Sequence, residues 1–283
     1  MAWYFILLIV LSATVLALFA LWLFLVAPRA RKKAVQPFLR PYAHRGLWGA
    51  GLPENSLGAF RAAAGKGFAI ELDIQLSRDG EVMVFHDYTL DRVCGRTGKI
   101  CELDAAELGN IPLNGVETEH IPTLREVLDA VDGRVPLLIE LKGENANTAL
   151  VPAALKVLEG YQGLWCMESF NPLLLRAVKK QAPHVVRGLL STNLLKEKKS
   201  GSKLLNFALS AHLLCFLCRP AFLASDKKYL HRAGLRVGLA LFGAAPVVYT
   251  VKKEADYRAF LKAGITPIFD EFCPTADGNG AAE

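Results

Sequence analysis

Residues 135–142, Val-Pro-Leu-Leu-Ile-Glu-Leu-Lys, restrict the fold of this chain more than any other stretch. This almost continuous apolar run is typical of a strand buried on both faces of a parallel sheet. Helical and strand patterns alternate after it, with helices at about 147–160 and 172–181 and strands at 164–170, 185–190, 221–224, 247–251 and 265–269. Repeated strand–helix units in a chain of 283 residues predict an α/β fold, a (β/α)8 TIM barrel.

The opening of the predicted barrel is irregular. Residues 71–87 form two alternating patterns around a tight turn at 78–80, which is too short for a parallel crossover. We therefore expect an antiparallel hairpin in a distorted barrel, with Glu71 opposite His86 and Asp73 opposite position 84. Because side chains alternate faces along a strand, Glu71, Asp73 and His86 are expected on one face.

The first segment is of a different kind. Residues 3–26 carry no charge, and about two dozen such residues can cross a bilayer. A cleaved signal peptide is less favoured, because there is no basic leading region, the run is too long, and no small-residue cleavage site precedes Arg29. We expect a transmembrane anchor at 1–28, a basic juxtamembrane linker at 29–40, the barrel at 41–275 and a flexible tail at 276–283.

The charges beside the span predict its orientation. Arg29, Arg31, Lys32 and Lys33 follow it, and only the amino terminus precedes it. The positive-inside rule then places a single-pass protein in the cell membrane with its catalytic region in the cytoplasm. These four residues account for much of the net charge of +6, so we expect membrane lipids as partners and no nucleic acid.

A second apolar stretch, residues 203–218, is short for another span. One interpretation is a barrel helix buried on one side, which we favour. The other is a helix resting on the membrane, helped by Lys196, Lys198 and Lys199.

Polar residues gather at the ends of the predicted strands, where a barrel builds its active site. Three carboxylates make an oxygen-rich site that suits one divalent cation, Mg²⁺ or Ca²⁺, and is too hard for zinc. Two histidines can serve as base and acid, while an arginine and a lysine suit a phosphate. Together these groups predict cleavage of a phosphate ester. They are Glu71, Asp73 and Glu140; His44 and His86; Arg45 and Lys142.

An ordered set of motifs carries a resemblance to a known family. The motifs are His44-Arg45-Gly46, Pro53-Glu54-Asn55-Ser56, Glu71-x-Asp73, His86-Asp87 and Glu140-Leu-Lys142. Over residues 41 to about 274 the chain resembles the glycerophosphodiester phosphodiesterase family, as a membrane-anchored, bacterial-type member. The resemblance implies a distorted TIM barrel that hydrolyses a glycerophosphodiester to glycerol 3-phosphate and an alcohol.

The resemblance also implies roles for single residues. Glu71, Asp73 and Glu140 look like the metal ligands, and His44 and His86 look like the acid/base pair. Arg45 resembles a phosphate-binding residue, Lys142 lies near the substrate in this comparison, and Glu54 matches a carboxylate close to the metal. Tyr249 stands where the family usually has a tryptophan on the alcohol side of the pocket, which leaves the leaving-group preference open.

Two other functions fit parts of the sequence. The anchor and the apolar stretch at 203–218 suit a lysophospholipase D-type phosphodiesterase that acts on membrane lipids. A non-catalytic, membrane-tethered barrel is the other alternative, since Glu140 and Lys142 could form a plain ion pair. That alternative would be favoured by loss of a ligand or a histidine, and none is missing.

Overall fold

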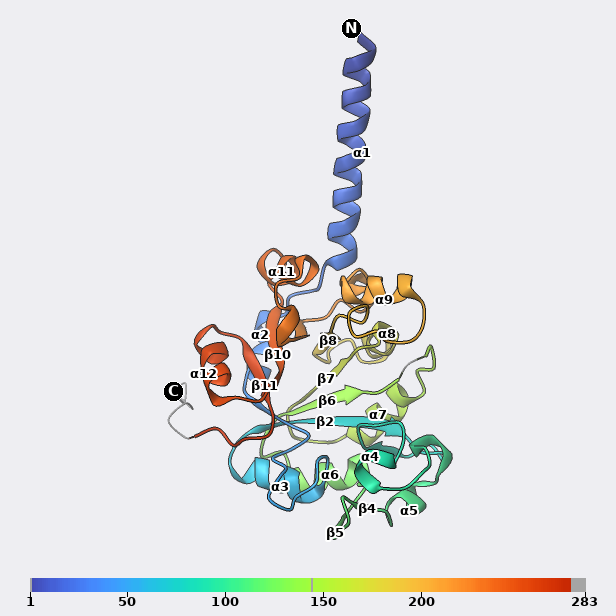
Figure 1. Ribbon diagram of the computed structural model, residues 1–283, viewed down its shortest axis with the longest axis vertical. Helices are drawn as coiled ribbons and strands as arrows, with labels where there is room; N and C mark the ends of the chain where they lie inside the picture. The colour runs from blue at the N-terminus through green and yellow to red at the C-terminus, as the bar shows by residue number, and fades with distance from the viewer. Residues whose placement is uncertain (1, 144, 276–283) are drawn as a thin grey trace.

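The computed structural model describes residues 2–143 and 145–275, so the expected tail at 276–283 lies outside the described residues. Parallel strands close into a barrel, because the first strand pairs with both the second and the last. The predicted (β/α)8 barrel is therefore confirmed (Figure 1). In order around it, the strands are β1 (Tyr42–His44), β2 (Ala69–Leu76), β6 (Leu137–Leu141), β7 (Trp165–Ser169), β8 (Arg187–Ser191), β9 (Phe222–Asp226), β10 (Ala245–Val251) and β11 (Thr266–Phe269).

Helices cover the outside of the barrel. Several begin at a side chain that caps the free backbone amides, as Thr123 and Glu126 do reciprocally in a capping box. The helices are α3 (Leu57–Gly65), α6 (Leu124–Val131), α7 (Leu150–Leu158), α8 (Pro172–Gln181), α9 (Lys203–Ser210), α10 (Cys215–Cys218), α11 (Ala233–Ala240) and α12 (Glu254–Lys262), with a 3₁₀ turn η3 (Lys227–Tyr229).

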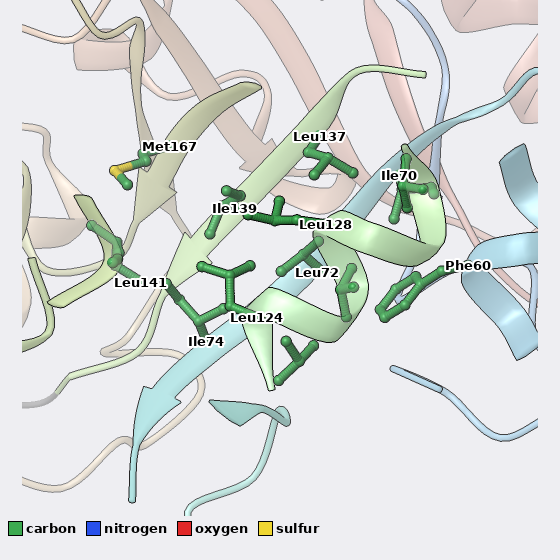
Figure 2. Packing of buried hydrophobic residues seen from close by; sticks show 14 of the residues in the cluster. Phe60, Ile70, Leu72, Ile74, Leu124, Leu128, Leu137, Ile139, Leu141 and Met167 are labelled. Atoms are coloured by element: carbon green, nitrogen blue, oxygen red, sulfur yellow. The ribbon is translucent and has the colours of Figure 1, made fainter. Parts of the chain in front are cut away.

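Alternation along β2 separates the core from the site. Ile70, Leu72 and Ile74 point outward and pack against α3 and α6, as Figure 2 shows, in one buried apolar cluster with the outward residues of β6. Glu71 and Asp73 take the positions between them and therefore face the barrel interior. The same two-residue period that builds the outer core thus brings carboxylates inside.

The hairpin pairing differs by one residue from the expectation. Ile74 pairs with Val84, the last residue of β3 (Val82–Val84), so His86 lies beyond the ladder rather than opposite Glu71. The reason is the turn, because Ser77 and Glu81 close a loop of three residues with Gly80 at φ +88°. The predicted antiparallel distortion of the barrel is nevertheless present.

After the hairpin, a small subdomain covers one side of the barrel. It contains α4 (Asp91–Cys94), η2 (Ile100–Glu102), α5 (Ala105–Leu108), β4 (Pro112–Leu113) and β5 (Val116–His120). Leu90 and Ile111 are buried in its own apolar cluster, and Leu103 packs against that cluster. These contacts give the turn-rich segment an apolar core of its own.

The floor of the barrel is apolar. Within the expected linker, α2 (Lys32–Val35) and η1 (Gln36–Phe38) place Val35 and Phe38 against Tyr42 and Leu138 inside the barrel. The polar interior residues therefore belong to the opposite end, where the strands finish.

The first helix, α1 (Ala2–Val26), projects away from the barrel (Figure 1). The segment Trp3–Val26 is long enough and apolar enough to cross a membrane. At its foot it contacts α10 and α11. We expected a single helix at 203–218. The structure instead has two, α9 and α10, separated by a turn that contains the buried His212. A left-handed φ of +62° at His212 ends α9 there.

Candidate active site

Three carboxylates meet inside the barrel. Oxygens of Glu71, Asp73 and Glu140 all lie within 4.8 Å of one another, and all three residues are buried. Register explains this convergence, because β2 and β6 pair in parallel with Asp73 beside Glu140. The residues expected to hold a metal are therefore brought together.

A fourth carboxylate stands next to this cluster. Glu168 on β7 pairs in register with Glu140, is 1% exposed, and its Oε2 has no hydrogen-bond partner. Sequence reasoning missed it, although a glutamate within a buried strand carries the same signal that singled out Glu140. Burial, followed by the charges of Glu140 and Asp73, raises the pKa of Glu168 well above its usual value.

The carboxylates differ in their ease of ionisation. Burial and then the charge of Asp73 raise the pKa of Glu71 well above its usual range. Burial also raises the pKa of Glu140, to about 7, against the opposing effect of Lys142. For Asp73, burial would raise the pKa, but Lys142 and the other neighbouring positive charges outweigh it and lower the pKa. Asp73 is thus the ionised centre of the cluster.

Two cations partly balance these charges. The Nζ of Lys142 lies 2.7 Å from Glu140 Oε1 and 2.8 Å from Asp73 Oδ1. The Nε of Arg45 lies 3.4 Å from Asp73 Oδ2. Ionisation of all four carboxylates would leave two negative charges unbalanced by these two cations.

The β1–α3 loop holds Arg45 in an unusual backbone conformation. Arg45, Gly46 and Asn55 have φ values of +60°, +82° and +55°. These conformations let the Arg45 amide donate to Glu71 Oε2 at 3.0 Å and the Asn55 side-chain amide donate to Asp73 Oδ2 at 2.9 Å. Left-handed backbone at non-glycine residues is uncommon, and here it aims donors at the carboxylates.

His44 is oriented by a carboxylate from the last strand's end. Its Nδ1 lies 3.2 Å from Asp270 Oδ2, and its Nε2 lies 3.9 Å from Glu71 Oε2. A fixed partner on Nδ1 sets the ring orientation and leaves Nε2 on the side of the cluster. Asp270 lies just beyond the strand predicted at 265–269, and a carboxylate at the carboxyl end of a barrel strand is a site signal that sequence reasoning did not use.

His86 has the same arrangement. Its Nδ1 lies 2.5 Å from Asp87 Oδ1, and Asp87 is held by Arg92, whose Nε lies 2.6 Å from Asp87 Oδ2. Burial lowers the pKa of His86, although Asp73 opposes that effect. The neutral ring is thereby favoured near neutral pH, as a proton acceptor requires.

Glu54 is placed differently from the metal cluster. It pairs with Arg45 at 2.8 Å and with Arg92 at 2.6 Å, and hydrogen bonds from Arg92 help to lower its pKa although burial opposes them. Arg92 was not anticipated, because it lies in the subdomain where no pattern marked it. Glu54 therefore bridges two guanidinium groups rather than completing the three-carboxylate cluster.

Tyr249 lies on β10 with its hydroxyl donating to the Ser191 carbonyl at 2.7 Å. Its ring packs edge-to-face on Phe170, with centroids 6.0 Å apart. Burial, followed by the charges of Glu140 and Glu168, raises the pKa of Tyr249. The two rings form an aromatic pair on the β7–β10 side of the site.

The donor set fits a hard divalent cation. Buried carboxylates that raise one another's pKa are stabilised in their ionised form by a doubly charged ion and supply the oxygen ligands that such ions prefer. Among the described residues, the members of this cluster are all carboxylates, and no cysteine is one of them.

Comparison with known proteins agrees with this geometry. The profile of the "Glycerophosphoryl diester phosphodiesterase family" matches residues 44–273. The chain is 31% identical over 240 residues to a glycerophosphodiester phosphodiesterase of Caldanaerobacter subterraneus subsp. tengcongensis, which covers 81% of this chain and 92% of that protein. A second enzyme of that name, from Bacillus subtilis, is 25% identical over 81% of this chain and 82% of its own length.

Solved structures agree with the fold. An Oleispira antarctica phosphodiesterase in complex with the product sn-glycerol-3-phosphate superposes with a TM-score of 0.67 at 25% identity, covering 82% of this chain and 92% of the other. A glycerophosphodiester phosphodiesterase from Thermotoga maritima gives a TM-score of 0.63 at 26% identity, over 82% and 94% of the two chains. On these grounds, the chain belongs to the glycerophosphoryl diester phosphodiesterase family and is a phosphoric diester hydrolase that acts on glycerophosphodiesters.

Proposed function

We propose that this protein hydrolyses glycerophosphodiesters to glycerol 3-phosphate and an alcohol with two-histidine acid/base catalysis. The observation that carries the proposal is the meeting of three buried carboxylates with two histidines that each have a carboxylate on Nδ1. Orienting partners on both rings are expected of groups that must pass protons in a fixed direction.

In this proposal His86 accepts the proton of the nucleophile, because its lowered pKa keeps the ring neutral. His44 donates a proton to the leaving alkoxide, and Asp270 orients its ring through Nδ1. Arg45 and Lys142 lie beside the cluster and offer donors to the phosphoryl oxygens.

Glu71, Asp73 and Glu140 would hold one divalent cation, Mg²⁺ or Ca²⁺. A bound cation would supply charge neutralisation at the phosphate, which favours attack on an anionic diester. Tyr249 and Phe170 would contact the alcohol, so a larger or smaller ring at position 249 should change the choice of alcohol.

Assay of purified protein on glycerophosphocholine tests the reaction. Release of glycerol 3-phosphate that stops on chelation and returns with Mg²⁺ or Ca²⁺ supports the proposal. A chelation-insensitive reaction in wild type would contradict the metal assignment, and undiminished turnover in Glu71→Ala would contradict its role as a ligand.

We further propose that α1 is retained as a single-pass anchor in the cell membrane, with the barrel in the cytoplasm. The supporting observations are its apolar length and the four basic residues that follow it. Cys101 on the small subdomain and Cys273 after β11 are exposed, so both report the side of the membrane on which the catalytic domain lies. An impermeant maleimide should leave both unlabelled in intact cells and label them after lysis; labelling in intact cells would reverse the orientation.

One observation favours a second substrate class, lysophospholipids taken from the bilayer. Leu204, Leu205 and Phe207 on α9 are 77%, 51% and 49% exposed, and Leu241 beyond α11 is 64% exposed. Figure 1 shows α9 and α11 on the side of the barrel from which α1 rises. Such residues suit an interfacial surface that holds the barrel against the bilayer.

Comparison of two substrates separates the two classes. We expect Leu204→Ser/Phe207→Ser to lower hydrolysis of lysophosphatidylcholine vesicles at least fivefold and to leave soluble glycerophosphocholine within twofold. The matched control is Leu164→Ser, which removes a leucine that is 49% exposed elsewhere on the barrel. Absence of hydrolysis of lysophosphatidylcholine by wild type would exclude the second substrate class.

A further inference from the structure

A cavity of about 490 Å³ lies at the foot of α1, away from the carboxylate cluster. Five of its seven lining residues are cationic, and the other two are prolines. They come from three parts of the chain: the segment after α1, the end of α8 with the start of β8, and the turn before β9. The lining residues are Pro28, Arg29, Arg31, Lys179, Pro183, Arg187 and Arg219.

The cavity is at the opposite end of the barrel from the active site. Arg187 is the first residue of β8, and Arg219 precedes the start of β9. The catalytic candidates instead follow or end their strands, as His44 does on β1. A ligand in this cavity would therefore not contact the carboxylate cluster.

The positive charges of the cavity lack acidic partners. Among the described residues, none of its five cations lies within ion-pair distance of a carboxylate. Arg187 is only 5% exposed, and its Nε has no hydrogen-bond partner. Carbonyls satisfy only part of the group, since Nη1 donates to Val185 at 2.6 Å. A buried, unpaired guanidinium is costly unless an anion completes it.

Other cavity residues are also held by carbonyls alone. Arg31 donates to the carbonyl of Pro183 at 2.9 Å, and Lys179 donates to that of Leu217 at 3.2 Å. Burial, followed by the charge of Arg31, lowers the pKa of Arg187. Like charges thus crowd together here with no anion from the described chain between them.

The end of α1 is part of the same structure. Arg219 donates to the carbonyls of Phe24 and Ala27 at 3.3 and 2.8 Å, and its guanidinium lies 4.7 Å from the centroid of the Phe24 ring. The cavity therefore begins where the apolar helix ends. If α1 spans a bilayer, this is the depth of the lipid headgroups.

We propose that this cavity binds the phosphate group of an anionic lipid, such as phosphatidic acid, and so fixes the barrel against the membrane. The proposal rests on the proposed membrane insertion of α1 and is independent of the catalytic roles. Guanidinium groups suit a phosphate because they offer paired donors in one plane. A soluble phosphate would be recognised by the same chemistry, so the experiment includes it.

Lipid retention by the full-length protein in detergent micelles tests the proposal. Native mass spectrometry would measure binding of phosphatidic acid and of phosphatidylcholine, with inorganic phosphate as competitor. The test variant is Arg31→Gln/Lys179→Gln. The matched control, Lys32→Gln/Lys33→Gln, removes the same charge beside the span but from residues that do not line the cavity.

We expect wild type to bind phosphatidic acid at least tenfold more tightly than phosphatidylcholine. The cavity variant should lose at least tenfold in affinity for phosphatidic acid, while the control variant stays within twofold of wild type. Equal losses in both variants would show diffuse charge attraction and overturn the proposal. Displacement of phosphatidic acid by millimolar phosphate, or unchanged binding by the cavity variant, would also overturn it.

Two further measurements distinguish a failure of the lipid-binding proposal from a failure of the proposed catalytic function. Thermal unfolding of both variants without lipid shows whether the substitutions disturb the fold, and Arg219→Gln gives a second cavity variant if the first unfolds. Hydrolysis of soluble glycerophosphocholine should be unchanged in the cavity variant. Failure of the catalytic proposal would instead appear as absent hydrolysis with lipid binding intact.

Discussion

The sharpest consequence of the carboxylate cluster concerns Glu140, whose replacement by glutamine should stabilise the protein without a cation and lose most of that advantage when a cation is added. Without a cation, burial and the charge of Asp73 disfavour the ionised form of Glu140. Lys142 does not depend on Glu140 alone, because it also lies 2.8 Å from Asp73. Glutamine at position 140 therefore removes an unfavourable buried charge without leaving the lysine unpaired.

The size of the effect follows from the pKa. Glu140 has a folded-state pKa of about 7 against an ordinary value of 4.5. A raised pKa means that its stabilising contribution is present below pH 4.5 and is lost as pH rises to about 7. At ~1.4 kcal/mol for each tenfold change in proton affinity, the ionised form costs about 3 kcal/mol at pH 8. For a protein of this size that corresponds to about 6–12 °C in Tm.

Thermal unfolding at pH 8 tests this reasoning. In chelator, Glu140→Gln should melt above wild type by up to that amount. With cation at a hundred times Kd, wild type should gain about 2.7 kcal/mol, whereas the variant, which lacks one ligand, should gain less than about 1 kcal/mol. The exposed Glu117→Gln serves as control and should change neither value.

A lower Tm of Glu140→Gln than of wild type in chelator would contradict a raised pKa at Glu140. It would mean that Glu140 is ionised and stabilising, a plain partner of Lys142 rather than a carboxylate waiting for a cation. An equal cation-induced gain in both proteins would likewise show that Glu140 is not a ligand.

Three further predictions follow from the site. His44→Ala and His86→Ala should each lower kcat by ~10²–10⁴ with an unchanged circular dichroism spectrum, and near-normal turnover in either would exclude its catalytic role. Because burial lowers the pKa of His86, the acid limb of kcat/KM should fall below pH 6.5. In Asp87→Asn that limb should move to still lower pH, since the Asp87 hydrogen bond raises this pKa; an unmoved limb would exclude Asp87 as a positioning residue. Gly46→Ala should lower stability by ~1–3 kcal/mol, measured by urea unfolding, because its Cβ would lie 2.8 Å from the Ala59 carbonyl carbon at φ +82°; an unchanged midpoint would contradict the tight approach.

The strand–helix alternation and the placement of Glu71 and Asp73 could be predicted because both follow from local periodicity. A strand buried on both faces must be apolar, so Glu140 was conspicuous for the same reason. Glu168 carried an equal signal and was overlooked, although its register partner is Glu140. Carboxylates that face the barrel interior can thus be predicted from the sequence when every apolar strand is searched for an acidic residue.

Other features depend on geometry that no local pattern contains. The register of the hairpin depends on whether its loop has two residues or three. One additional loop residue shifts every cross-strand pair by one position. The contact between Asp270 and His44 needs closure of the barrel, which brings β11 next to β1. Arg92 reaches Glu54 only because a separate subdomain folds over the loop, so its role could not be inferred from spacing.

The proposed reaction breaks one particular ester bond and depends on both histidines. ³¹P NMR of glycerophosphocholine incubated with the purified protein and Mg²⁺ or Ca²⁺ can follow both features in one experiment. Glycerol 3-phosphate should appear with wild type and be absent with His44→Ala or His86→Ala. Formation of phosphocholine instead, or the same glycerol 3-phosphate signal from both histidine variants, would contradict it.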